Sequence, residues 1–165
     1  MKTLLMDTMR KSDATQVLAI FQEGIDTKNA TFETKVPTWE EWDRDHISSC
    51  RLVAREGDRV VGWAALTPAS SRAAYAGVAE VSIYLRIESV GQGLGSRLLE
   101  ALIKTSEENG FWTLTSGIFP ENKNSMALHE KLGFRKMGTQ ERIGKLDGVW
   151  RDVVQMERRS EVVGV

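Results

Sequence analysis

Apolar and polar residues alternate most regularly over residues 80–85, which read Glu-Val-Ser-Ile-Tyr-Leu. The side chains of a β-strand point alternately to its two faces, so this alternation predicts a strand. Glu80, Ser82 and Tyr84 would share one face of that strand, and the three apolar residues would share the other. We expect this strand to be the centre of the fold, because a glycine-rich turn and a helix follow it directly.

The turn over residues 90–95 reads Val-Gly-Gln-Gly-Leu-Gly, and behind it leucine and isoleucine recur at helical spacing as far as Ile103. This spacing predicts an amphipathic helix that ends near Asn109, with Gly110 as its C-cap. Glycines let the backbone approach a ligand closely. The first N–H groups of a helix lie at the positive end of its dipole and are free to bind an anion. The turn therefore predicts an anion site, and we expect the anion to be a phosphate.

The remaining hydrophobic pattern predicts a mixed α/β sheet. Strands are expected over residues 3–9, 51–55, 60–66, 111–118, 134–145 and 149–157, and further helices over residues 13–25, 38–47 and 125–132. Asp13 with Gln16, and Thr38 with Glu41, have the spacing of capping boxes at two of the helix starts. Asp147 and Gly148 predict a type I′ turn between the last two strands.

Composition then narrows the class of protein. The chain has 165 residues, of which 41% are apolar, and this is the size of one ordinary domain spanning residues 1–165. Cys50 is the only cysteine, which excludes an internal disulfide and fits a reducing compartment. No segment has the length and apolarity of a signal peptide or a membrane span. The formal net charge of −1 gives no basic field for nucleic acid. We expect a cytoplasmic protein that binds neither nucleic acid nor membrane.

Three kinds of nucleotide site can be compared with the glycine turn. A Walker loop needs a lysine and a hydroxyl residue after its last glycine, whereas Gly95 is followed by Ser96 and Arg97. A dinucleotide-binding fold has G-x-G-x-x-G near the start of repeated βαβ units. Here the spacing is G-x-G-x-G, and a predicted hairpin precedes it. The third kind is an acyl-coenzyme A site, in which the pyrophosphate binds this turn.

Residues 90–95 resemble the Arg/Gln-x-x-Gly-x-Gly/Ala motif of the GCN5-related N-acetyltransferase (GNAT) family, and residues 122–134 are similar to its Asn-x-x-Ser…Gly-Phe segment. Residues 80–84 and 128–130 further resemble the branch that acetylates phosphinothricin, methionine sulfoximine and arsinothricin. These motifs occur in the family's order, and the resemblance covers essentially the whole chain. It implies the GNAT fold, a central, mostly antiparallel sheet flanked by about four helices. It also implies acetyl-CoA as co-substrate, no metal, and a homodimer.

The resemblance implies a set of coenzyme-binding residues as well. In the family the central strand separates from the next strand, so that its free main-chain groups pair with the pantetheine arm, and one N–H polarises the thioester oxygen. Val90 departs from the motif, and we expect weaker coenzyme binding as a result. The implied cofactor-binding residues are Ile83, Tyr84, Leu85, Val90, Gly91, Gln92, Gly93, Leu94, Gly95, Ser96, Asn122 and Ser125. Capping of the following helix is an equal alternative for Asn122, and the two roles can coexist.

Glu80 is the candidate catalytic residue. An amine must lose a proton when it attacks a thioester, and a carboxylate at the edge of a cleft can take that proton. Taken alone, a glutamate at the end of a strand is more often simply solvated. The resemblance favours catalysis, because Glu80 matches the proposed base of the branch. His129 stands where many relatives carry a tyrosine that protonates the departing thiolate, but we expect it to pack on its helix.

The acceptor pocket is implied by the resemblance too. Its substrate-binding residues would be Phe32, Arg72, Tyr75 and Glu80. Arg72 would clamp a carboxylate, phosphinate or arsinate through two parallel hydrogen bonds, with a solvated surface arginine as the alternative. The predicted acceptor is a small anionic amino acid analogue, which connects the enzyme with resistance to such toxins.

Other functions stay open at this point. His46 and Cys50 are four residues apart and would share a helical face, which suggests an acyl-cysteine intermediate or metal binding. A third orienting group is not apparent, however, and two ligands make a poor metal site. A non-catalytic acyl-CoA-binding module and a peptide or protein N-acetyltransferase are the remaining alternatives.

Overall fold

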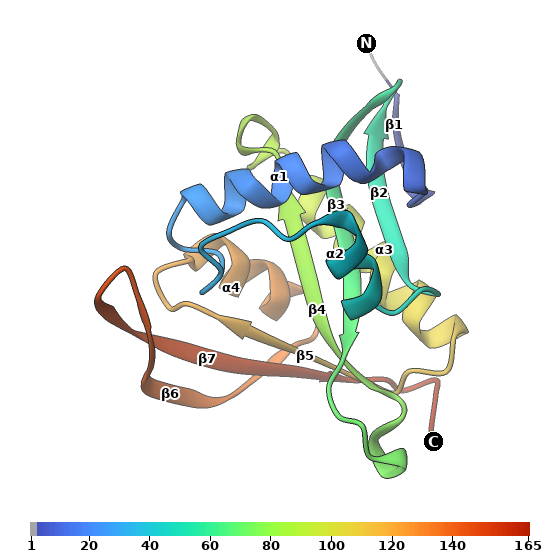
Figure 1. Ribbon diagram of the computed structural model, residues 1–165. Coiled ribbons are helices and arrows are strands. Elements are labelled where there is room, and N and C mark those ends of the chain that lie inside the picture. The colour runs from blue at the N-terminus through green and yellow to red at the C-terminus, as the bar shows by residue number, and fades with distance from the viewer. Residues whose placement is uncertain (1–2) are drawn as a thin grey trace.

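The computed structural model describes residues 3–165, and within them seven strands form one sheet (Figure 1). The strands are β1 (Leu4–Thr8), β2 (Arg51–Glu56), β3 (Arg59–Pro68), β4 (Val78–Leu85), β5 (Thr113–Ile118), β6 (Arg135–Leu146) and β7 (Val149–Arg159). Their order across the sheet is β1-β2-β3-β4-β5-β7-β6, and every neighbouring pair is antiparallel except β4 and β5. The prediction of a mixed, mostly antiparallel sheet is confirmed.

β4 and β5 pair over a short stretch before they separate. Their parallel pairing runs from Val78 opposite Thr113 to Glu80 opposite Thr115, whereas β4 continues beside β3 as far as Leu85. A strand that loses one neighbour leaves main-chain N–H and C=O groups free on that side. The separation implied by the family resemblance is therefore present, and it begins directly beyond Glu80.

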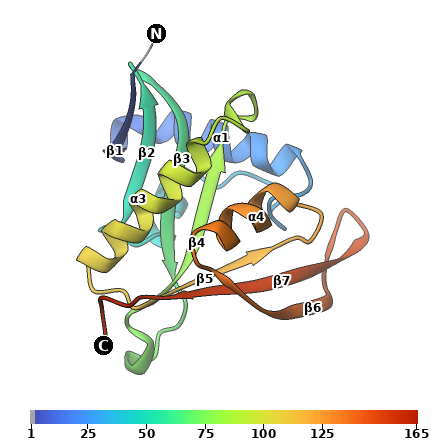
Figure 2. The same cartoon turned by 180° about the vertical axis from the view of Figure 1, so that it is seen from behind.

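Four helices cover the two faces of the sheet. α1 (Ala14–Asp26) and α2 (Trp39–Asp45) lie on one face, and α3 (Leu94–Glu108) and α4 (Lys123–Lys131) lie on the other (Figures 1 and 2). None of the helices in residues 3–165 combines the length and the apolar character that a membrane crossing requires.

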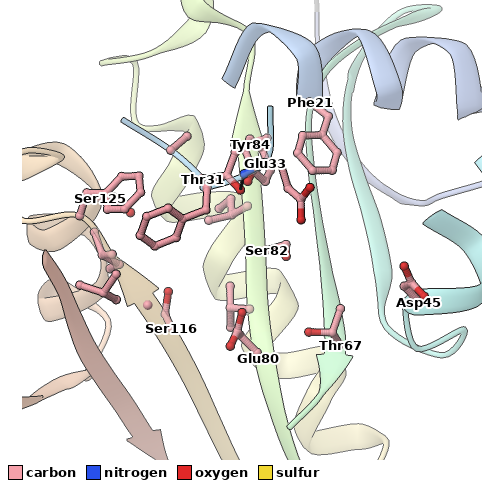
Figure 3. Close-up of a pocket in the computed structure, with 18 of the residues that line it drawn as sticks. Phe21, Thr31, Glu33, Asp45, Thr67, Glu80, Ser82, Tyr84, Ser116 and Ser125 are labelled. Atoms are coloured by element: carbon pink, nitrogen blue, oxygen red, sulfur yellow. Dashed lines mark hydrogen bonds between the residues drawn. The ribbon is translucent and has the colours of Figure 1, made fainter. Parts of the chain in front are cut away.

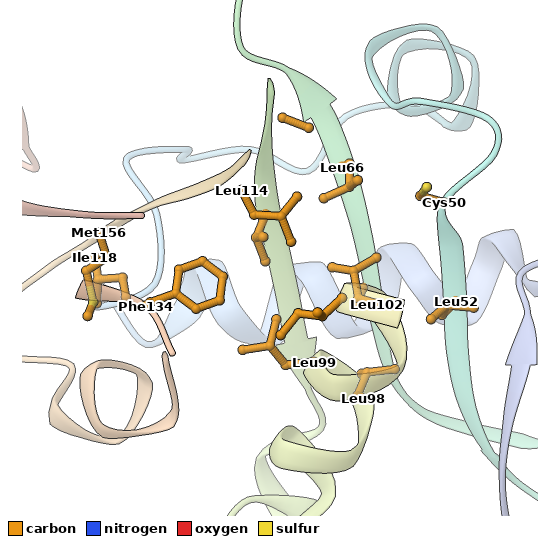
Figure 4. Close-up of a cluster of buried hydrophobic side chains, with 14 of the residues drawn as sticks. Cys50, Leu52, Leu66, Leu98, Leu99, Leu102, Leu114, Ile118, Phe134 and Met156 are labelled. Carbon is orange, nitrogen blue, oxygen red and sulfur yellow. The ribbon is translucent and has the colours of Figure 1, made fainter. Parts of the chain in front are cut away.

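Each face packs against its helices through an apolar cluster. Phe21, Trp42 and Trp63 belong to the cluster under α1 and α2. The larger cluster places leucines of α3 against side chains from β2, β3, β4 and β5 (Figure 4). Burial stabilises the fold by roughly 1.5–3 kcal/mol per large apolar side chain. Because both faces are packed, β4 is held rigidly where its polar residues line a site.

The second helix is shorter than the sequence predicted. α2 ends at Asp45, and His46 follows in an extended conformation. The predicted extension to residue 47 is wrong, because the backbone at His46 has φ −105° and ψ 142°, which is extended and cannot continue the helix. His46 and Cys50 therefore do not share a helical face.

The two predicted capping boxes have different outcomes. Thr38 accepts from the N–H of Glu41 and donates its own N–H to that glutamate, as predicted. The box of Asp13 with Gln16 is wrong. Asp13 instead accepts from the N–H of Arg10, and Gln16 reaches across to accept from the N–H of Val60 at 2.9 Å. Asp13 also accepts from Arg55, 42 residues away, and the partner of Gln16 is 44 residues away, so the local pattern does not reveal these contacts.

Candidate active site

A pocket of about 800 Å³ opens where β4 and β5 separate (Figure 3). It is bounded by these two strands, the start of α4, α2, and the segment between α1 and α2. The polar and titratable residues that line it include Thr31, Glu33, Lys35, Thr38, Glu41, Asp45, His46, Thr67, Glu80, Ser82, Tyr84, Ser116, Asn122, Ser125, His129, Gln140 and Gln155. The polar face predicted for residues 80–84 is therefore turned toward this pocket.

Glu80 lies at the point where the strands part, and its carboxylate has no hydrogen bond or ion pair with the described part of the chain. Glu80 is exposed to solvent through the pocket, yet the surrounding walls desolvate its carboxyl enough to raise its pKa. Burial raises the pKa of a carboxyl because it disfavours the charged form. A carboxylate with a raised pKa and no partner is suited to accept a proton.

Tyr84 forms part of the wall above Glu80. Its ring lies 4.9 Å from that of Phe21 and stacks on Trp63 at 5.0 Å. A Cβ at Gly24 would come within 2.6 Å of the Tyr84 ring, so a glycine is required where α1 crosses it. Burial raises the pKa of Tyr84 to about 12, with the charge of Glu33 adding to the effect. The phenol therefore stays protonated and cannot act as a base.

The glycine turn leads directly into α3. Gly91 and Gly93 have φ of 87° and 76°, a region that side-chain-bearing residues rarely adopt. Gly93 is the N-cap of α3, and no side chain caps the helix there. Val90 is 43% exposed beside these glycines. The first N–H groups of α3 are thus available to an anion, as the sequence predicted.

The other residues predicted around this turn are placed as follows. The Gln92 amide donates to the carbonyl of Glu88 at 3.3 Å, and Ser96 accepts from Lys131 of α4 at 3.4 Å. Leu94 is buried, and Gly95 lies so close to α4 that a Cβ would meet Leu128 at 3.2 Å. Ile83 lines the pocket, and Leu85 packs against the larger core.

Glu23, on α1, holds the segment that precedes the turn, a role that sequence reasoning missed. Its carboxylate accepts from the N–H of Ile87 at 2.9 Å and pairs with Arg86 at 3.4 Å. Arg86 in turn donates to the carbonyl of Val60 at 2.7 Å. The turn is therefore fastened to both α1 and β3. Because Glu23 and Ile87 are 64 residues apart, no local signal could have found this contact.

Asn122 and Ser125 lie at the start of α4 and both line the pocket. The Asn122 side chain accepts from the N–H of Ser125 at 3.2 Å and donates to the carbonyl of Asn29 at 3.3 Å. The capping alternative is therefore confirmed. Its position beside the pocket still allows Asn122 to bind a ligand as well.

The surroundings of His129 are more polar than the sequence predicted. The ring is 1% exposed and packs edge-on against Phe134, as expected, yet it also lines the pocket. Nδ1 donates to the carbonyl of Ser125 at 2.7 Å, and Nε2 has no partner among the described residues. Burial lowers the pKa of the ring, which keeps it neutral. With its hydrogen on Nδ1, the imidazole presents a lone pair at Nε2. This contact could have been found from the sequence, because Ser125 stands four residues before His129, about one turn of a helix away.

The segment between α1 and α2 forms the opposite wall. Phe32 lies in the pocket wall with its ring edge-on to Phe119 at 4.9 Å. Arg151 of β7 donates to the carbonyl of Lys28 at 2.6 Å and to the side chain of Asn29 at 2.7 Å. Contacts from the far end of the chain therefore fix this wall.

Arg72 and Tyr75 are not brought to the pocket wall in this conformation. They lie in the connection between β3 and β4, where the Arg72 guanidinium stacks over the Tyr75 ring at 5.6 Å. That connection leads into the end of β4 that carries Glu80 (Figure 1).

The acyl-cysteine alternative receives no support. Cys50 is buried in the core beside α3, and burial raises the pKa of its thiol. His46 stacks on Trp42 at 3.9 Å, in the other cluster. Among residues 3–165, no group of three or more His, Cys, Asp or Glu side chains could hold a metal ion.

Comparisons with known proteins agree with this geometry. The model of the acetyltransferase (GNAT) family matches residues 16–134. The phosphinothricin N-acetyltransferase of Streptomyces viridochromogenes is 32% identical over 155 residues, covering 92% of this chain and 85% of that protein. The L-methionine sulfoximine/L-methionine sulfone acetyltransferase of Pseudomonas aeruginosa is 27% identical over 152 residues, or 88% of each chain. A phosphinothricin acetyltransferase from Sinorhizobium meliloti, solved in complex with AcCoA, superposes with a TM-score of 0.85 at 28% identity over 98% of this chain and 96% of that one. The chain belongs to the acetyltransferase (GNAT) family.

Proposed function

We propose that this enzyme transfers acetyl from acetyl-CoA to the α-amine of a small amino acid or amino acid analogue, with Glu80 as general base. The observation that carries the proposal is the unpartnered carboxylate of Glu80 at the point where β4 and β5 part. The relatives named for phosphinothricin and methionine sulfoximine support this class of acceptor. A single N-acetyltransferase domain over residues 1–165, acting as a cytoplasmic homodimer, completes the proposal.

The donor site is built from main-chain groups. The uncapped start of α3, with left-handed Gly91 and Gly93, fits a pyrophosphate. The free edge of β4 beyond Glu80 fits the amides of a pantetheine arm, and a main-chain N–H at Ile83 or Leu85 would polarise the thioester oxygen.

Bound acetyl-CoA supplies a thioester carbonyl that an amine can attack. Glu80 takes a proton from the acceptor ammonium, either directly or through a water, so that the amine can form the new C–N bond. The nitrogen then loses its second proton to water as the C–S bond breaks, which leaves the neutral amide, and the coenzyme leaves as a thiolate that solvent can protonate. Glu80 returns its proton to solvent. His129, with a lone pair at Nε2, is not set up to donate a proton in this tautomer.

The acceptor would lie between Glu80 and the wall formed by Phe32 and Tyr84. Arg72 would bind the acceptor's α-carboxylate after leaving its stacked position on Tyr75. This use of Arg72 and Tyr75 is supported by the family resemblance and by their place just before β4.

A panel of amines scored by release of coenzyme A tests the proposal. The panel contains methionine sulfoximine, methionine sulfone, phosphinothricin, arsinothricin, a polyamine and a peptide. We expect the amino acid analogues to exceed the peptide in kcat/KM, and Arg72→Ala to lower kcat/KM for them without changing the KM for acetyl-CoA. A higher kcat/KM for the peptide would show that the acceptor is a peptide or protein and not a small amino acid. Binding of acetyl-CoA without release of thiol to any amine would indicate a non-catalytic module.

A further inference from the structure

The charged groups on the pocket wall are mostly acidic, and this bears on which amino acid the site accepts. Among the described residues that line the pocket, four carry a carboxylate and one carries an ammonium. The carboxylates belong to Glu33, Glu41, Asp45 and Glu80, and the ammonium to Lys35. An acceptor therefore enters a site with excess negative charge.

Two of these carboxylates already have partners. Glu41 accepts from both the N–H and the hydroxyl of Thr38, each at 3.0 Å, as part of the helix cap. Asp45 pairs with Arg44 at 3.7 Å. A partner within hydrogen-bond or ion-pair distance reduces the field that such a group exerts on a ligand. Glu33 and Glu80 are therefore the two carboxylates of the pocket wall that have no hydrogen-bond or ion-pair partner among the described residues.

Glu33 is held in place by its backbone and its neighbours while its carboxylate stays free. Its N–H donates to the Thr31 hydroxyl at 3.1 Å, and the preceding Phe32 packs on Phe119. The Glu33 carboxylate has no hydrogen bond or ion pair with other described residues, and it lines the pocket. Burial contributes most to the raised pKa of Tyr84, but the charges of both Glu33 and Glu80 add to it. Figure 3 shows Glu33 beside Tyr84 and Glu80 further along β4, so the two carboxylates line the same pocket at different positions.

The charges can be assigned to the parts of an amino acid acceptor. Its α-ammonium matches Glu80, which would take its proton. Its single α-carboxylate matches one cation, either Lys35 on the wall or Arg72 from the adjoining connection. The side chain of the acceptor is then left to face Glu33. A phosphinate or arsinate there would add a second anion beside an uncompensated carboxylate, whereas a sulfoximine or sulfone is polar and uncharged.

We infer that this pocket selects amino acids whose side chain ends in an uncharged polar group over those that end in an anion, and that Glu33 determines this specificity. The inference rests on the proposed function and narrows its acceptor class. It also reverses the preference for anionic analogues that the sequence suggested.

Steady-state kinetics with L-methionine sulfoximine and L-phosphinothricin at saturating acetyl-CoA test the inference. We expect the wild type to prefer the sulfoximine by ~10-fold or more in kcat/KM, the size expected of one like-charge contact in a partly solvated pocket. Glu33→Gln keeps the shape of the side chain and removes its charge. It should raise kcat/KM for phosphinothricin by ~5- to 10-fold while changing that for the sulfoximine by less than about 2-fold.

Glu40→Gln is the matched control, because Glu40 is an exposed glutamate of α2 that does not line the pocket. It should leave the ratio of kcat/KM for the sulfoximine to kcat/KM for phosphinothricin unchanged. A measurement on the wild type alone provides a second test. Raising the salt from about 0.05 M to about 0.5 M should narrow the preference, because salt screens repulsion between charges that water can reach.

The outcomes separate the inference from the function on which it rests. A narrowed preference in Glu33→Gln and at high salt supports the inference. A wild type that prefers phosphinothricin, or a preference that neither Glu33→Gln nor salt alters, overturns it and leaves the acetyltransferase function intact. Failure to acetylate any amine overturns the proposed function, and the inference with it.

Discussion

Asp13 and Glu80 are two carboxylates in opposite circumstances within the same fold. Asp13 precedes α1 and is 3% exposed. It accepts from the N–H of Arg10 at 2.9 Å and from both terminal nitrogens of Arg55, at 2.8 and 3.1 Å. Glu80 lies beside an open pocket, and its carboxylate has no partner within the described chain.

The difference appears in the direction of each pKa shift. Hydrogen bonding to Arg55 lowers the pKa of Asp13, whereas burial raises the pKa of Glu80. A carboxylate whose charge is fully bonded stabilises the fold and resists protonation. A carboxylate that is partly desolvated and unbonded does little for the fold but can exchange a proton. Pairing therefore distinguishes Asp13, a structural carboxylate, from Glu80, the proposed base.

The largest expected effect follows from removing the unpaired carboxylate. Glu80→Gln should lower kcat by ~10²–10³-fold, the usual contribution of a positioned base. Its melting temperature should stay within about 2 °C of the wild type, because Glu80 has no partner to lose. Since the pKa of Glu80 is raised, wild-type kcat/KM should fall as the pH drops through that raised value, and this limb should be absent in Glu80→Gln. Thiol release over a pH series and thermal unfolding measure both effects. Full activity in the variant would remove Glu80 from the mechanism.

The paired carboxylate should give the reverse result. Asp13→Asn weakens charge-assisted bonds in a buried site, and we expect a loss of about 2–3 kcal/mol in the free energy of unfolding with kcat unchanged. Because the pKa of Asp13 is lowered in the folded state, its stabilisation is fully present above the unfolded value of about 3.9. It is lost as the pH falls through the lowered value. Urea unfolding should thus show a higher free energy of unfolding for the wild type than for Asp13→Asn near neutral pH, and this difference should disappear in acid. A difference that persists in acid would contradict this account.

The contrast also shows what the sequence could reveal. The hydrophobic pattern along the chain was enough to predict the mixed sheet and the helix that follows the glycine turn. The anion site at that turn stays a prediction, and Glu80 was favoured as the base only through the family resemblance. The hydrophobic pattern is local to single elements. Asp13 binds Arg55 across 42 residues, Glu23 binds Ile87 across 64 residues, and Arg151 holds Asn29 across 122 residues. Nothing in a local pattern encodes such contacts, because they depend on how the finished sheet brings segments together.

Charge balance in the pocket was hidden for the same reason. The family resemblance implied that Arg72 binds an anionic acceptor, whereas Glu33 and Lys35, which precede Glu80 by more than forty residues, gave no such signal. Only the folded chain shows that these two line the pocket while Arg72 stacks on Tyr75.

Glu23 is a third case, a paired carboxylate that holds the segment before the glycine turn, where we propose that the pyrophosphate binds. Glu23→Ala removes the acceptor for the N–H of Ile87 and the ion pair with Arg86. We expect the KM for acetyl-CoA to rise by ~5-fold, the equivalent of about 1 kcal/mol, with kcat little changed. Glu23→Gln keeps an oxygen for Ile87 and should recover part of this loss. Equal loss of kcat in both variants would instead indicate general damage to the fold.

The smallest effect is expected at Val90, where the family motif places a charged or amide side chain and this chain has none. Val90 is 43% exposed at the edge of the turn, so water screens any charge introduced there. The main-chain N–H groups of the turn and of α3 would provide most of the binding energy for the pyrophosphate. Val90→Arg should therefore tighten acetyl-CoA binding by only ~3-fold, within the range of exposed ion pairs. Val90→Leu, which adds no charge, should leave the calorimetric Kd unchanged. A gain in acetyl-CoA affinity far above this range would mean that the turn excludes water and that a side-chain charge contributes strongly to coenzyme binding there.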